Sequence, residues 1–219
     1  MRGFLVGIIL VAAPLHAVEP LAIQDNSFLI EEAYNLERGV VQHIFTFSRD
    51  GGESVASFTQ EWPVTGQRHQ FSYTIPVQRL DGESRIGDML INYRYQLVGD
   101  GAARVAVSPR ASLVAPTGDS DVWGYELNLP VSVALGNRLV THWNAGLADN
   151  SQEDAAYFAG VSLIAAVREK FHLILETRWT DDGESEVVVS PGVRWAWDRR
   201  NGFQVVPGIA APIGDDTRA

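Results

Sequence analysis

The sequence has no cysteine among its 219 residues. This absence excludes disulfides, a thiolate nucleophile and metal sites built on cysteine. An exported chain of this composition must hold its fold together without covalent links between its elements. Basic residues are also scarce, with 17 against 27 acidic ones, and the net charge of -10 disfavours nucleic acid as a partner.

Long apolar runs are missing as well. No stretch reaches the roughly 20 apolar residues that a membrane-spanning helix needs. The main apolar run, residues 4–13, follows Arg2 and precedes Pro14 and the small residue Ala17. A basic residue, a short apolar core and a small residue in this order predict a secretory signal peptide over residues 1–17. The chain is therefore expected to be exported.

What the sequence does contain, from residue 39 onward, is alternation of polarity. In residues 124–147, Leu127 and Leu129 alternate with Glu126 and Asn128, and the pattern resumes after a short turn. Side chains of a strand point to opposite faces in turn, so each such stretch has an apolar and a polar face. We count about eleven strand candidates of roughly nine to thirteen residues, separated by clusters of Gly, Asp, Asn and Ser. The pattern predicts an all-β, antiparallel up-and-down meander.

The apolar faces of these strands are nearly free of charge, whereas the polar faces carry charges in mid-strand. The strand lengths match a transmembrane strand of about 9 to 11 residues, and aromatic residues such as Tyr125, Trp179 and Trp197 lie near strand ends. We therefore predict a transmembrane β-barrel over residues 39–219, with the apolar faces toward lipid and the polar faces toward a lumen. The expected location is the outer membrane of a Gram-negative bacterium, with the bilayer and lipopolysaccharide as partners.

Residues 18–38 lie between the predicted signal peptide and the first strand. Asp25 or Asn26 can cap a short helix that reaches Tyr34, with Glu31 and Glu32 in its early turns. We expect a short N-terminal helix here, either in the periplasm or as a plug of the barrel.

The connections between the strands alternate in charge. If the amino end is periplasmic, the odd-numbered connections face outward, and they carry 15 acidic residues and 3 arginines. The even-numbered connections carry 7 basic and 3 acidic residues. This segregation favours acidic loops outside the cell and basic turns in the periplasm, as in outer-membrane barrels with short inner turns.

Residues 25–47, DNSFLIEEAYNLERGVVQHIFTF, resemble the opening of a bacterial outer-membrane β-barrel family. Its members are labelled transporters, or proteins of the meta-pathway of phenol degradation. The later motifs APTGD and GIAAPIGDD resemble the strand-to-loop repeats of that family. The resemblance implies an outer-membrane pore or uptake protein for small solutes, which can be hydrophobic or aromatic, and it implies no catalytic residues.

The charged residues on the polar faces are the candidates for a solute-selecting site. They are Asp88, Arg94, Arg110, Glu126, Glu176, Arg178 and Arg194. One interpretation is a charged constriction that selects solutes by sign, as rings of charged side chains do in pores. The other is that opposite charges pair across a narrow lumen and satisfy one another.

Two other classes of function stay open. A structural or adhesive barrel would use its acidic loops to bind divalent cations and lipopolysaccharide. An outer-membrane hydrolase would need a nucleophile, a base and an orienting acid in contact, and His142 and His172 are the inward-facing histidines. Neither has a local catalytic signature. We expect no enzyme activity, no cofactor and no metal site.

The count of strands leads to a further expectation. Closed single-chain barrels of bacteria have an even number of strands, so twelve are expected where about eleven are counted. The eleventh candidate, residues 203–213, is followed by an acidic stretch and no returning strand. We therefore expect the barrel to lack its last strand, which leaves a seam between the first and the eleventh.

The motifs VSPRA, VSPGV and VVPGI place a proline inside three strands. Proline removes a donor from the hydrogen-bond ladder, so Pro109, Pro191 and Pro207 are expected at bulges or bends.

Overall fold

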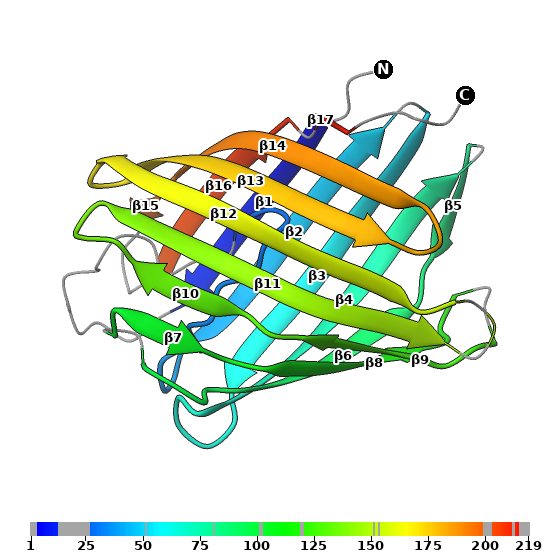
Figure 1. Cartoon of the computed structure of the whole chain (residues 1–219), viewed down its shortest axis with the longest axis horizontal. Coiled ribbons are helices and arrows are strands. Elements are labelled where there is room, and N and C mark those ends of the chain that lie inside the picture. Colours follow the sequence, from blue (N-terminus) through cyan, green and yellow to red (C-terminus); the bar gives the residue numbers. More distant parts are fainter. Residues whose placement is uncertain are drawn as a thin grey trace.

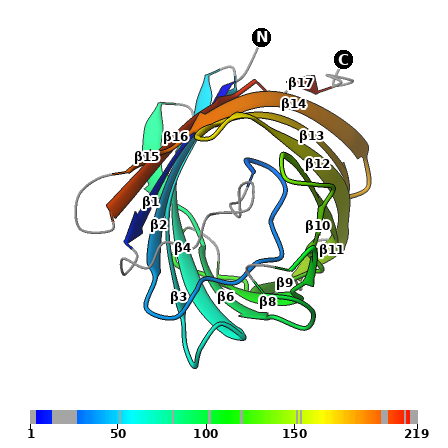
Figure 2. The same cartoon turned by 90° about the vertical axis from the view of Figure 1, so that its left-hand side faces the viewer.

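The computed structural model describes residues 4–12, 27–50, 52–80, 82–100, 103–118, 121–150, 152, 154–198, 203–211 and 213–214. The described chain is built from strands that curl into a barrel around a central lumen (Figures 1 and 2). The strands are β1 Phe4–Ala12, β2 Val41–Asp50, β3 Glu53–Pro63, β4 His69–Leu80, β5 Glu83–Ile86, β6 Met89–Tyr95, β7 Val105–Val107, β8 Arg110–Ala115, β9 Gly124–Asn128, β10 Val131–Ala134, β11 Leu139–Asn150, β12 Ala156–Arg168, β13 Phe171–Asp181, β14 Ser185–Trp195, β15 Trp197–Asp198, β16 Phe203–Ala210 and β17 Ile213–Gly214.

All pairings are antiparallel, and most of them join strands that are neighbours or near neighbours along the chain. They lead from β2 through β3, β4, β6, β8, β9, β11, β12, β13 and β14 to β16. The prediction of an all-β, up-and-down antiparallel barrel is confirmed. Among the described residues, no helix is long and apolar enough to cross a bilayer.

The strand β1 lies between β2 and β16 and pairs with both of them. All eleven predicted strand candidates from residue 40 onward are present as β2 to β17, and β1 fills the place at which a seam was expected. Phe4–Ala12 is also the apolar core of the predicted signal peptide, of which residues 1–3 and 13–17 lie outside the described residues. The same segment cannot be both cleaved and paired, so removal of residues 1–17 stays a prediction.

Two prolines interrupt strands that the sequence pattern predicts as continuous. Pro109 separates β7 from β8, and Pro130 separates β9 from β10. The two breaks lie side by side, because Ser108 donates its backbone N–H to the carbonyl of Pro130 at 3.1 Å. Pro109 is therefore at a bend, as expected. Pro191 and Pro207 instead lie within the paired strands β14 and β16, and Pro130 is a break that the sequence analysis missed.

The two faces of the wall have the polarity that the alternation predicts. Leu127, Leu163, Leu175 and Val189 point outward and are 38–49% exposed. The buried polar residues point inward, and they include Gln70, Ser72, Asn92, Arg94, Gln96, Ser108, Ser112, Asn128, Ser132, His142, Asn144, Ser162, His172, Glu176, Ser190 and Arg194. The barrel is thus apolar outside and polar inside, which is the reverse of a soluble barrel.

The predicted N-terminal helix is wrong for the residues that the structure describes. Residues 27–38 form no helix and instead run as an irregular strand-like segment inside the barrel (Figure 2). Asp25 and Asn26, the expected caps, lie outside the described residues. We call residues 27–38 the plug. The plug position was one of the two expected, but the backbone bonds to the barrel wall rather than to itself.

Candidate functional site

The plug crosses the lumen from β13 to β4. A turn connects it to β2, where Val40 donates its N–H to the Glu37 carbonyl and Gly39 has a φ of 86°. Irregular backbone inside a barrel leaves donors and acceptors that need partners. In this molecule, inward side chains of the wall supply them.

Glu176 of β13 binds the N-terminal end of the plug, which we call its inner end. Its carboxylate accepts hydrogen bonds from the backbone N–H groups of Phe28, Leu29 and Ile30 at 3.1, 2.8 and 3.0 Å. The side chain is fully buried. Three donors on one carboxylate form a compact cradle of charge-assisted hydrogen bonds, which are stronger than neutral ones.

Two inward residues of neighbouring strands hold the middle of the plug. The Asn144 amide accepts from the backbone N–H of Glu31 and donates to its carbonyl, both at 2.8 Å. Ser132 Oγ accepts from the N–H of Ala33 at 2.7 Å. The Asn144 side chain thus makes the two backbone hydrogen bonds that a neighbouring strand would otherwise make with Glu31.

Arg94 of β6 and Gln96, which directly follows β6, bind the C-terminal part of the plug, which we call its outer end. The Arg94 guanidinium donates to the carbonyls of Glu32 and Tyr34, both at 3.0 Å, and to Asn35 Oδ1 at 2.9 Å. Gln96 accepts from the N–H of Asn35 and donates to the carbonyl of Ala33. The sequence pattern predicted Arg94 as a solute-selecting charge, but its guanidinium hydrogen-bonds to backbone carbonyls of the plug.

Arg110 of β8 joins the plug to the wall by ion pairs. Its Nη2 lies 2.6 Å from Glu31 Oε1 of the plug and also contacts Glu126 Oε1 of β9. The same guanidinium donates to Asn92 Oδ1 at 3.0 Å and to Ser112 Oγ. One cation therefore serves two carboxylates within the lumen.

Two apolar side chains of the plug sit over glycines of the wall. A Cβ at Gly208 or Gly192 would lie 2.6 or 3.0 Å from the Phe28 ring, and a Cβ at Gly160 would lie 2.3 Å from Ile30 Cδ1. A side chain at Gly208 or Gly160 would force the plug residue to shift, and one at Gly192 would press on the Phe28 ring. The glycines are thus sockets that admit Phe28 and Ile30 close to the wall.

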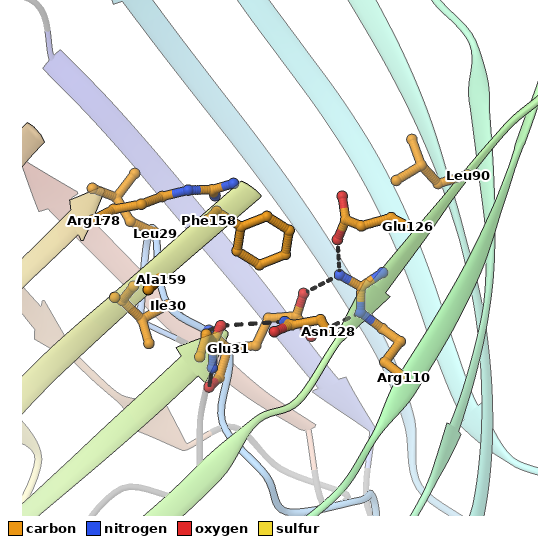
Figure 3. A pocket seen from close by; sticks show the side chains of 12 residues that line it. Leu29, Ile30, Glu31, Leu90, Arg110, Glu126, Asn128, Phe158, Ala159 and Arg178 are labelled. Carbon is orange, nitrogen blue, oxygen red and sulfur yellow. Dashed lines mark hydrogen bonds and ion pairs between the residues drawn. The ribbon is translucent and has the colours of Figure 1, made fainter. Parts of the chain in front are cut away.

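Two cavities flank the plug. The first, which we call the Phe158 cavity, has a volume of about 220 Å³ and is lined by Leu29, Ile30, Glu31, Leu90, Arg110, Glu126, Asn128, Asn144, Phe158, Ala159, Gly160 and Arg178 (Figure 3). The second, the Phe28 cavity, has about 250 Å³ and is lined by Gly7, Ser27, Phe28, Leu29, Ile30, Glu31, Ile44, Thr46, Arg178, Arg194 and Val206. Leu29, Ile30, Glu31 and Arg178 line both, so the two cavities adjoin across the plug.

The structure brings six of the seven predicted charged residues into the lumen: Arg94, Arg110, Glu126, Glu176, Arg178 and Arg194. Asp88 is the exception, because it precedes β6 and accepts from the N–H of Gly118 at 3.0 Å in the connection after β8. Arg110 and Glu126 form an ion pair between the adjacent strands β8 and β9 rather than across the lumen. Arg94 and Glu176 instead bind plug backbone, which no charge pattern of the strands reveals.

The two inward histidines, His142 and His172, are both buried. His142 is fully buried, and its Nδ1 lies 2.6 Å from Ser132 Oγ, which also accepts from the plug. No acid contacts His142 Nε2 among the described residues. The pair thus has a candidate nucleophile and base but neither access nor an orienting acid. In the described part of the chain, no group of three or more His, Asp or Glu residues is arranged to hold a metal ion.

Several residues of the site were not singled out from the sequence. Glu31, Asn35, Gln70 and Gln96 contribute plug contacts, and Phe158 contributes the ring of the cavity. Alternation had placed Gln96 and Asn144 on the polar face. Their partners are backbone groups of a distant segment, and backbone groups carry no sequence signal.

Comparisons with known proteins add little to this geometry. No family model matches the sequence, and no curated protein matches it. Among solved structures, a triple mutant of a porin from Rh. blastica is similar over 97% of this chain and 99% of the porin chain, at 8% identity and a TM-score of 0.26. A TM-score this low carries no argument, so the function is argued from the lumen itself.

Proposed function

We propose that the chain is an outer-membrane β-barrel channel for small solutes, with residues 27–38 as an internal plug that regulates passage. The outward faces support the membrane location, because they carry large apolar residues over strands of 10–13 residues such as β2, β11 and β12. A water-exposed surface of this kind would be an aggregation hazard. In hydrocarbon it is the stable face.

The observation that carries the channel proposal is the size of the inward side chains. Beside its larger polar residues, the wall presents ten small ones to the lumen: Ser72, Ser108, Ser112, Ser132, Ser162, Ser190, Gly146, Gly160, Gly192 and Gly208. Barrels that only need to be solid fill their interior with side chains of the wall. Here a separate segment fills the space, so displacing the plug opens a polar passage without unfolding any strand.

The solute class is the finer part of the proposal. The resemblance of residues 25–47 to a transporter family favours hydrophobic or aromatic solutes. The apolar residues of the two cavities, such as Leu29, Leu90 and Phe158, support a solute with an apolar portion. Charged groups in the same cavities support a polar portion as well.

A structural barrel is the second candidate, and the extent of plug bonding favours it. Every backbone N–H from Phe28 to Glu31, and those of Ala33, Asn35 and Leu36, donates to a wall side chain. A plug held this firmly makes a closed barrel whose acidic loops bind cations and lipopolysaccharide. The two candidates differ in whether the plug moves.

A disulfide lock tests this difference, and the lack of cysteine makes the experiment clean. The pair Ala33→Cys and Ser132→Cys joins the plug to β10, where the Ala33 nitrogen and Ser132 Oγ are 2.7 Å apart. We expect the reduced barrel to conduct ions in planar bilayers and the oxidised barrel to be closed. The single variant Ala33→Cys is the matched control and should ignore the oxidant.

Two results contradict the proposal. A folded barrel with no conductance in either redox state favours the structural candidate. Equal conductance in both states shows that solutes pass a fixed plug.

A further inference from the structure

The Phe158 cavity lies between the inner end of the plug and one mouth of the barrel. Its wall residues Glu126, Phe158 and Arg178 are each within four residues of a strand end, next to the connections at 116–123, 151–155 and 182–184. The cavity is therefore the first internal site that a solute meets from this mouth. Its residues define which solute that is.

Arg178 forms one side of the cavity. Its guanidinium carbon lies 4.9 Å from the centre of the Phe158 ring, a cation–π contact that fixes the group in place. Among the described residues it makes no hydrogen bond and no ion pair. A guanidinium has five donors in a planar fork suited to a carboxylate. This side of the cavity is built for an anionic group.

The opposite side carries two carboxylates against one guanidinium in contact with them. Glu31 and Glu126 both contact Arg110, so two carboxylates share one guanidinium. Arg94 makes no hydrogen bond to either of these carboxylates, because its guanidinium donates to plug carbonyls and to Asn35. Figure 3 places Glu126 and Arg178 on opposite sides of the Phe158 ring. This second side is suited to a cationic group.

The cavity is small, and Leu29, Ile30, Leu90 and Phe158 form the apolar part of its lining. A cavity of about 150 Å³ accepts benzene, which has six non-hydrogen atoms. The Phe158 cavity is about one and a half times as large, so it accepts a molecule of about nine non-hydrogen atoms. An apolar body the size of a short branched chain therefore fits.

The rim of this mouth argues against a net anion. The described residues of the connections at 116–123, 151–155 and 182–184 include Asp121, Asp154, Asp182 and Glu184 and no Lys or Arg. A rim of one charge sign repels solutes of the same sign and lowers their rate of entry. A solute that needs Arg178 must therefore bring a positive charge too.

We infer that the Phe158 cavity binds a small zwitterion with an apolar body, of the kind represented by leucine. The carboxylate binds Arg178, the ammonium group binds at Glu126 and Glu31, and the side chain packs on Phe158 and Leu90. This inference rests on the proposed channel function, because it names the solute class of that lumen.

Three probes of the same shape test the inference on the full chain in detergent micelles. They are leucine, 4-methylpentanoate, which lacks the ammonium group, and 3-methylbutylamine, which lacks the carboxylate. Binding is measured by isothermal titration calorimetry. We expect leucine to bind at least tenfold more tightly than either single-charge probe, because only leucine pairs with both sides.

Two variants assign the charges. Arg178→Gln should weaken leucine binding at least tenfold and leave the amine unaffected. Glu126→Gln removes one of the two carboxylates, so it should weaken leucine and the amine but not 4-methylpentanoate. Arg85→Gln, at an exposed ion pair with Glu83 in β5, is the matched control and should bind leucine as the unaltered chain does. Heat-modifiable migration in gels verifies that each variant is folded.

The outcomes separate this inference from the proposed function. Equal affinity for the three probes, or binding unchanged in both variants, overturns the zwitterion site. A barrel that conducts ions but binds none of the probes overturns the inference alone. A barrel that binds leucine but never conducts overturns the channel function and leaves the site standing.

Discussion

The Oε1 atom of Glu176 lies 2.8 Å from the backbone nitrogen of Leu29, although the two residues are 147 positions apart. The same carboxylate also holds Phe28 and Ile30. This contact makes one wall residue responsible for the inner end of the plug.

Replacing Glu176 should loosen the plug without opening the barrel wall. Glu176→Ala leaves three backbone donors without their acceptor, and hydrogen bonds to a charged group contribute about 1.5–3 kcal/mol each. We expect higher single-channel conductance and faster proteolysis within residues 27–38. Glu186→Ala, an exposed glutamate on β14, is the control. Conductance that rises equally in both variants would contradict the role of Glu176.

The Arg110 cluster should show strong coupling between its members. Arg110→Gln leaves the half-buried carboxylates of Glu31 and Glu126 without their cation, and the loss should fall below the about 3–5 kcal/mol that breaking a fully buried pair costs. Adding Glu126→Gln to that variant should recover part of the loss, because one repelling carboxylate is removed. Urea unfolding in lipid vesicles of the two single variants and the double variant gives the coupling energy. Additive losses would mean that the two residues act independently.

Charge on the outward face should be tolerated according to depth. Leu175 lies in the middle of β13, whereas Leu135 follows the end of β10, and both are exposed. Arginine at Leu175 should cost about 2–4 kcal/mol near the midplane, and arginine at Leu135 about 1 kcal/mol or less. Unfolding from vesicles measures both. Equal costs would argue that the outward face does not meet lipid.

The acidic connections should lie outside the cell. An epitope tag at Gly183, in the connection between β13 and β14, should be accessible to antibody on intact bacteria. A tag at Asn137, in the turn between β10 and β11, should become accessible only after the outer membrane is opened. The reverse labelling would invert the topology.

The mass of the mature protein shows whether Phe4–Ala12 is removed or kept. If residues 1–17 are a cleaved signal peptide, the protein from outer membranes begins near Val18, and β2 and β16 lose the strand between them. Intact mass spectrometry distinguishes this from a chain that keeps β1. The signal-peptide prediction fails if residues 4–12 are retained in the mature protein.

The alternation of polarity predicted the strands and their faces because the period of two is imposed by backbone geometry at every residue. Leu127 and Asn128 therefore took the sides expected of them. The plug was misjudged for the opposite reason. Asp25, Glu31 and Glu32 fit a helix start locally, but wall side chains such as Asn144 and Gln96 offer the backbone better partners than a helix of one or two turns does. Asp88 fits the inward register equally well, yet it precedes the first paired residue and binds a loop.

The glycine sockets also link two distant parts of the chain. Phe28 lies near the N-terminus, but its seat is formed by Gly192 of β14 and Gly208 of β16, near the other end of the sequence. These two strands pair directly, Gly192 with Ala210 and Arg194 with Gly208. A slip of one residue between them would turn a glycine away from the lumen and put a larger side chain against the Phe28 ring. A seated plug therefore requires that this part of the wall has paired in the observed register.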